Sequence, residues 1–148
     1  MIRYRITFAL YLLNAIGMLA IGLAYQFNDQ FMPYHSDVIQ TNWNDLQEKQ
    51  QILYIGMMRT EAAGFLASST AIIFLLFIPY RNRLLWSTYA IACVGIIEYL
   101  PSLIATYHVS TVSEASPPWP VLLLGTFMFL IGLVLSVPVL RKGSSGGT

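Results

Sequence analysis

Four long apolar segments dominate the chain and restrict what it can fold into. They cover residues 6–25, 62–79, 84–105 and 121–140, and Glu98 is the one charged residue within them. Each is close to the roughly 20 residues that a helix needs to cross the hydrocarbon core of a bilayer. Lipid offers a backbone amide no hydrogen-bond partner, so such segments are helical. The sequence therefore predicts an all-α membrane protein, a bundle of four transmembrane helices.

The scarcity of charge excludes several classes of protein. Charged residues make up 10% of the chain and hydrophobic residues 56%, whereas a soluble domain carries roughly 25% charged residues. The net charge of +1 gives no electrostatic basis for binding nucleic acid. Cys93 is the only cysteine, which excludes an internal disulfide and a CxxC metal or redox motif.

The distribution of charge between the connecting segments predicts the topology. Six cations fall on one side of the predicted bundle: Arg3, Arg5, Arg81, Arg83, Arg141 and Lys142. The other side carries residues 26–49, in which Asp29, Asp37, Asp45 and Glu48 outnumber Lys49, and residues 107–120, which contain Glu114 and no Lys or Arg. By the positive-inside rule, both termini are cytoplasmic and both larger loops are external. We expect a multi-pass protein of the cell membrane, of the bacterial inner-membrane type.

The first external loop is predicted to contain a short amphipathic helix. Four apolar residues fall near helical spacing there: Val38, Ile39, Trp43 and Leu46. Such a pattern is typical of a helix that lies at the membrane interface. Asp45 and Glu48 resemble a capping box, which would start the second span near residue 46.

These features predict a single membrane domain over residues 1–142. Its spans are expected at about 6–26, 46–79, 84–106 and 119–140. Residues 143–148, with the sequence GSSGGT, look like the remnant of an expression tag.

Three ionisable residues in or beside the second and third spans are the strongest candidates for a functional site. An ionisable group at bilayer depth is costly and marks a functional site by default. Glu61 lies 18 residues before Pro79, and Glu98 lies 14 residues after Leu84. Helical rise then places them about 27 and 21 Å above the cytoplasmic boundary, in the outer half of the membrane. Arg59 lies slightly nearer the outer surface.

The helix faces around these carboxylates favour a shared, outward-facing pocket. Glu61 shares its face with Gly64 and Ser68, and Glu98 shares its face with Ser102. Small residues of this kind let two helices approach closely. Polar side chains from the external segments are further candidates: Tyr34, His35, Tyr107 and His108. We predict that these four residues bind a ligand together with Arg59, Glu61 and Glu98.

Two other roles for the same residues stay open. Arg59 could form a structural ion pair with Glu61 or Glu98, which adds little net stability although it is costly to break. His35, His108 and the two glutamates are ligand types that suit zinc or iron. No local metal-binding motif is present in the sequence, so we expect no metal and no cofactor. Nucleotide-binding, hydrolase and metalloprotease motifs are also missing, and no catalytic residue can be assigned.

The second span carries the sequence YIGMMRTE over residues 54–61, followed by Gly64 and an apolar run. Together with the extended first external loop, this pattern resembles the small DoxX-like group of four-helix bacterial membrane proteins. The resemblance covers about half of the chain and implies a four-helix membrane fold, but no family role is carried over to any residue. The size and span number also fit the MAPEG enzymes, whose arginine- and asparagine-rich second-span signature is not matched.

Three functions are compatible with these features. The first is a non-enzymatic membrane protein that binds a small amphipathic or lipid-like ligand between spans two and three, or serves as an accessory subunit of a membrane complex. The second is a proton-coupled transporter that works as a homodimer, because a membrane carboxylate can exchange a proton for a substrate. The third is an enzyme acting on a lipid, with Glu61 or Glu98 as acid or base. We favour the first, with membrane lipids and no nucleic acid as partners.

Overall fold

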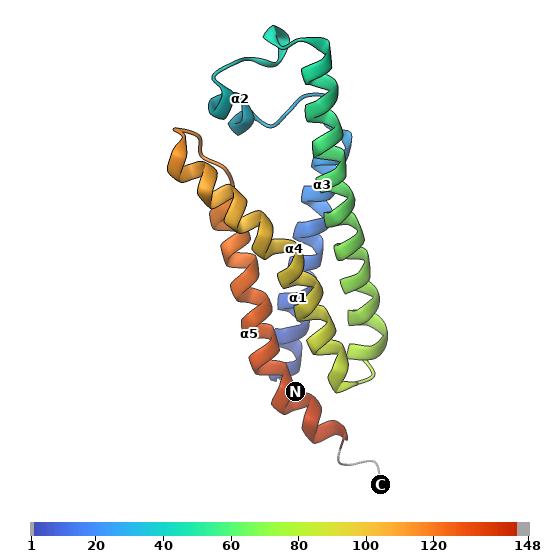
Figure 1. Cartoon of the computed structure of the whole chain (residues 1–148). Helices are drawn as coiled ribbons and strands as arrows, with labels where there is room; N and C mark the ends of the chain where they lie inside the picture. The colour runs from blue at the N-terminus through green and yellow to red at the C-terminus, as the bar shows by residue number, and fades with distance from the viewer. Residues whose placement is uncertain (1, 145–148) are drawn as a thin grey trace.

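The computed structural model describes residues 2–144, and every regular element in that part of the chain is helical (Figure 1). The long helices are α1 (Ile2–Phe27), α3 (Glu48–Leu75), α4 (Leu85–Val112) and α5 (Trp119–Ser144). The short elements are α2 (Pro33–Ile39) and the turn η1 (Trp43–Asp45), both between α1 and α3, and the π-helical turn η2 (Leu76–Tyr80), which extends α3. The predicted four-helix bundle and the short helix after the first span are confirmed. Of the predicted tag remnant, residues 145–148 lie outside the described residues.

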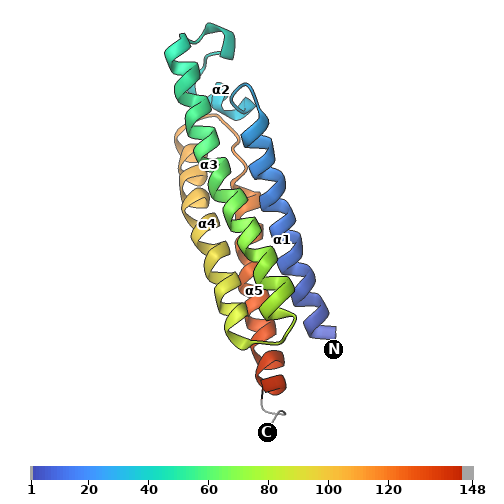
Figure 2. The same ribbon diagram turned by 90° about the vertical axis from the view of Figure 1, so that its right-hand side faces the viewer.

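The four long helices alternate in direction along the bundle. α1 packs against α3 and α5, and α4 packs against the same two helices, so the four form a closed ring in the order α1, α3, α4, α5. α1 begins and α5 ends at the same end of the bundle, here called the terminal end (Figures 1 and 2). The opposite end carries α2 and the upper part of α3, and is here called the loop end.

All four long helices are apolar and long enough to cross a membrane. Large apolar side chains also point outward from each of them: Leu13 is 59% exposed, Phe74 62%, Ile97 67% and Val134 71%. Apolar surface that surrounds a protein in this way marks contact with a membrane or with another protein. The structure therefore supports a multi-pass membrane protein, while the cytoplasmic position of the termini stays a prediction.

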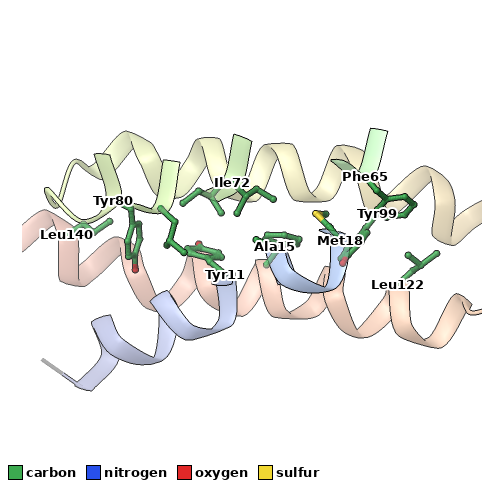
Figure 3. Packing of buried hydrophobic residues seen from close by; sticks show 12 residues of the cluster. Tyr11, Ala15, Met18, Phe65, Ile72, Tyr80, Tyr99, Leu122 and Leu140 are labelled. Atoms are coloured by element: carbon green, nitrogen blue, oxygen red, sulfur yellow. The ribbon is translucent and has the colours of Figure 1, made fainter. Parts of the chain in front are cut away.

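Aromatic rings packed onto glycines hold the interior of the bundle together. Tyr99 of α4 lies over Gly125 of α5, where an added β-carbon would be 2.2 Å from the ring. Phe129 of α5 lies over Gly95 of α4, where the same distance would be 2.3 Å. These rings belong to a cluster of buried side chains that runs along the bundle axis (Figure 3). Helices can approach closely in a membrane where their contact residues are small.

Hydroxyl groups link the helices near the terminal end. Thr7 of α1 is hydrogen-bonded to Tyr80 of η2, and Tyr11 of α1 to Thr88 of α4 at 2.7 Å. The hydroxyl of Thr88 is also hydrogen-bonded to that of Ser136 in α5. Buried hydroxyls need such partners because unpaired polar groups are costly inside a protein. Tyr80 itself is fully buried.

The start of α3 differs from the predicted capping box. The backbone N–H of Gln47 donates to Oε1 of Gln50 at 3.0 Å, and α3 begins at Glu48. Asp45 lies in η1, where Nδ2 of Asn42 donates to its carboxylate at 3.3 Å. The short helix of the loop also begins earlier than predicted. The apolar pattern indicated a helix over residues 38–46, whereas α2 begins at Pro33 and ends at Ile39.

Cysteine labelling tests the predicted topology. In a Cys93→Ser background, we expect Asn44→Cys in η1 to react with a membrane-impermeant maleimide in intact cells. Asn82→Cys, in the turn between η2 and α4, is expected to react only after the cells are permeabilised. Asn44 and Asn82 are both exposed and lie at opposite ends of the bundle. The reverse labelling pattern would contradict cytoplasmic termini.

Candidate ligand-binding site

A cavity of about 780 Å³ lies between the helices at the loop end. Its size falls within the roughly 300–1,000 Å³ that is usual for ligand pockets. All five α-helices contribute side chains to its wall, and Phe65 and Leu122 at its base belong to the core cluster. In Figure 1, α4 and α5 lean away from α3 toward this end. The predicted pocket between spans two and three is thus part of a larger space, which α2 partly covers.

Most of the wall is apolar. Its apolar side chains are Ile21, Val38, Ile39, Met57, Met58, Phe65, Pro101, Ala105, Val109, Pro117, Pro118, Val121 and Leu122. The remaining wall residues are Tyr25, Tyr34, His35, Tyr54, Glu61, Ser102 and Thr106. Among the described residues, Glu61 is the one wall residue with a formal charge at neutral pH. A predominantly apolar wall with few polar groups is the usual composition of a small-molecule site.

The two membrane carboxylates each accept a hydrogen bond from a serine on the opposite helix. Ser102 of α4 donates to Oε1 of Glu61 on α3 at 3.0 Å. Ser68 of α3 donates to Oε2 of Glu98 on α4 at 2.9 Å. The residues of each helix are four or seven positions apart and so share a face. The two pairs therefore hold α3 and α4 in register beside the cavity.

Gly64 allows the second of these pairs to form. A β-carbon at this position would lie 3.1 Å from Oε1 and 3.3 Å from Oε2 of Glu98. Such contacts are tighter than ordinary van der Waals packing, so a larger residue would displace the carboxylate. Glu98 is half-buried against α3 and does not line the cavity, whereas Glu61 is exposed to it.

Arg59 does not neutralise either carboxylate. Its side chain is exposed, and among the described residues it forms no ion pair. Arg59 and Glu61 are two positions apart on a helix, so they point in different directions. The structural ion pair considered from the sequence is therefore not formed. The serine hydroxyls take its place as partners of Glu61 and Glu98.

Aromatic side chains from the loop end cover the cavity. Tyr25 of α1 and Tyr34 of α2 share a hydrogen bond of 2.8 Å between their hydroxyl oxygens. Phe31 is buried and packs edge-on against Trp43 at 5.1 Å and Tyr54 at 5.4 Å between ring centroids. Edge-to-face pairs of this kind add stability beyond the area they bury. The loop after α1 is thereby attached to the upper part of α3.

The Tyr34 hydroxyl is electrostatically coupled to the cavity. Burial raises its pKa, and the hydrogen bond with Tyr25 and the negative charge of Glu61 raise it further. Each of these effects disfavours the phenolate. Tyr34 therefore remains a neutral hydroxyl at physiological pH, and it lies close enough to Glu61 to experience its charge.

His35 holds the first turn of α2. The backbone N–H of Met32 donates to Nδ1 of His35 at 3.2 Å, which requires that this nitrogen is unprotonated. Partial burial of the ring lowers the pKa of His35, because burial disfavours the charged form. The imidazole also packs against Phe31 and Tyr34. At neutral pH the ring is thus uncharged, with Nδ1 accepting from Met32 and Nε2–H left as a hydrogen-bond donor.

This arrangement predicts a loss of stability in acid. The pKa of His35 is lower in the folded protein than in the unfolded chain, where it is about 6.5. The unfolded chain therefore binds the proton first, and stability falls as pH drops below about 6.5. We expect the thermal midpoint to fall between pH 7 and pH 5, and to fall less in His35→Gln. His108→Gln, at an exposed histidine, serves as the control, and equal pH profiles for all three proteins would refute the role of His35.

The structure brings together some of the predicted site residues and separates others. Tyr34, His35 and Glu61 line the cavity, and Glu98 lies beside it in the same interface between α3 and α4. The other three predicted residues are exposed and outside the cavity wall: Arg59, Tyr107 and His108. Tyr107 instead packs edge-on against Trp119 at 5.5 Å.

Tyr25 is the main wall residue that the sequence did not indicate as part of a site. It ends the first apolar segment, where an aromatic residue is expected at the membrane interface in any case. Its pairing with Tyr34 depends on the return of the loop over the bundle, which no local pattern encodes. Pro117 and Pro118, which directly precede α5, also line the cavity and carry no chemical group that would indicate a site from the sequence.

Among residues 2–144, no three side chains of the metal-binding types lie close enough to hold a metal ion. In the same part of the chain, neither His35 nor His108 is hydrogen-bonded to Glu61 or Glu98. Compared with protein-family models, curated proteins and solved structures, the chain has no match. The DoxX-like resemblance is therefore still an expectation.

Proposed function

We propose that this chain is a small integral membrane protein that binds an amphipathic, lipid-like molecule in the cavity at its loop end. The observation that carries the proposal is the cavity itself, a space of about 780 Å³ with an apolar wall and few polar groups. The apolar residues suit a hydrocarbon body, and the polar groups from α1, α2, α3 and α4 suit one head group.

The position of the cavity supports an amphipathic ligand. Its base is formed by Phe65 and Leu122 of the apolar core, and its cover is formed by α2, outside the spans. Under the predicted topology, a ligand would lie with its tail at membrane depth and its head near the outer surface. An amphiphile in the outer leaflet already has this orientation, which reduces the cost of binding.

Thermal unfolding of the purified protein in lipid nanodiscs tests this proposal. A series of neutral and charged single-chain amphiphiles is added, and at least one is expected to raise the midpoint in a saturable manner. A ligand that binds only the folded state stabilises it by about 2.7 kcal/mol at 100 times its Kd. If no amphiphile in the series shifts the midpoint, the cavity is a packing feature and the proposal fails.

Transport is the second candidate, and it is favoured by one observation. Glu61 is exposed to the cavity and carries no ion pair within the described residues. A carboxylate in a membrane cavity can bind a proton and a cationic substrate alternately. Because one chain has only four spans, the transporter would be a homodimer. Proteoliposomes that contain it should show cation flux driven by a pH gradient. Flux that is equal in Glu61→Gln and the wild type would exclude this function.

A further inference from the structure

The charge of the ligand can be inferred from the residues of the cavity wall. We propose that the cavity takes a lipophilic organic cation, whose positively charged nitrogen head lies against the carboxylate of Glu61. This inference rests on the proposed binding function and names the chemical class of its ligand.

The charge of the cavity wall favours a cation. Among the described residues, Glu61 is the one wall residue with a formal charge, and no lysine or arginine lines the cavity. Ser102 fixes the position of Oε1, while Oε2 has no hydrogen bond from the described residues. The carboxylate is thus positioned but not neutralised. A single negative charge in an apolar wall attracts a cation more strongly than it would in bulk water.

The aromatic residues of the cavity also favour a cation. Tyr25, Tyr34 and Tyr54 all line it, from three different helices, and the neutral His35 ring lies among them. Aromatic faces attract cations, and quaternary ammonium groups are recognised in proteins by aromatic cages. Methyl groups on such a nitrogen would also fit the adjacent apolar wall.

The other head groups fit less well. A phosphate or sulfonate would lie near Glu61 without a lysine or arginine to balance it, and burying an unpaired charge is costly. A neutral alcohol could bond to Glu61 but would leave the charge of the carboxylate uncompensated. Of these head groups, a positively charged nitrogen on an apolar body is the one that satisfies both the wall and the carboxylate.

Two ligands of the same shape test the inference. One is decyltrimethylammonium, and the other is its uncharged isostere, in which carbon replaces the nitrogen. Binding of each is measured to wild-type protein in nanodiscs of zwitterionic lipid, with empty nanodiscs subtracted. We expect the cation to bind at least about tenfold more tightly than the isostere, as a partly desolvated charge pair would give.

Glu61→Gln is the matched variant, because a glutamine can still accept the hydrogen bond from Ser102. It is expected to weaken binding of the cation about tenfold and to leave binding of the isostere unchanged. Glu48→Gln, at an exposed residue outside the cavity, controls for net charge and should bind the cation as the wild type does. Size-exclusion profiles and thermal midpoints of both variants without ligand check that they are folded.

The outcomes separate this inference from the proposed function. If cation and isostere bind equally to the wild type, or if Glu61→Gln binds the cation unchanged, the inference is wrong while amphiphile binding stands. Tighter binding of decyl sulfonate than of the cation would also overturn it. If none of the three compounds binds, the proposed function loses its support as well.

Discussion

Replacing Gly125 by alanine is expected to destabilise the bundle by about 1–3 kcal/mol, the usual cost of overpacking a well-filled core. The added methyl group would lie 2.2 Å from the ring of Tyr99. That ring cannot easily move, because it is buried and packs against Phe65 and Phe129. α4 and α5 would have to separate, and the thermal midpoint should fall clearly.

Gly56→Ala is the matched control for this prediction. A β-carbon at Gly56 would have no other atom within 4 Å, and alanine is favoured over glycine in a helix by up to roughly 1 kcal/mol. The control should therefore keep or raise the midpoint. If both variants show the same thermal midpoint, α4 and α5 do not approach each other closely at Gly125.

Filling the cavity is expected to abolish ligand binding altogether. Ala105 of α4 lines the cavity and is exposed to it, so an indole at this position would occupy the space that the ligand needs. We expect Ala105→Trp to lose the ligand-induced rise of the thermal midpoint. Its midpoint without ligand should stay near that of the wild type or rise, because a filled void gains dispersion contacts.

Ala67→Trp provides the control for the added indole. Ala67 is exposed on α3 and is not part of the cavity wall. This variant should respond to amphiphiles as the wild type does. A full ligand response in Ala105→Trp would show that amphiphiles stabilise the protein from outside the cavity.

The four long helices could be predicted from the sequence because the bilayer imposes a simple requirement. Each apolar segment had to form a helix of sufficient length, and the bounds of α1, α3, α4 and α5 lie close to the expected spans. The serine and glycine positions beside Glu61 and Glu98 were also recognisable from helical periodicity. The structure shows the contacts they make.

The loop end could be predicted only in part. α2 begins at Pro33 because proline suits the first turn of a helix, and because Met32 donates its N–H to His35. The hydrophobic spacing of Val38, Trp43 and Leu46 indicated a later helix. In the structure Val38 lies in α2, Trp43 lies in η1 and Leu46 follows η1, so the spacing does not belong to one helix.

The composition of the site shows the same limit. Depth along a helix placed Glu61 and Glu98 at one level, but only the rotation of α3 and α4 decides which of them lines the cavity. That rotation puts Arg59 on the outside and leaves Glu61 exposed to the cavity. Tyr107 and His108 follow the outward face of α4 for the same reason. Rotations of this kind are determined by packing between helices, which a single sequence does not specify.

An experimental structure of the protein in nanodiscs, with a bromine-bearing alkylammonium added, decides whether the loop-end cavity is a ligand site. We predict bromine and head-group density inside the cavity, between α3 and α4, with the nitrogen next to Glu61. A cavity closed by its own side chains, or ligand density confined to the outer surface of the helices, would contradict amphiphile binding at this site.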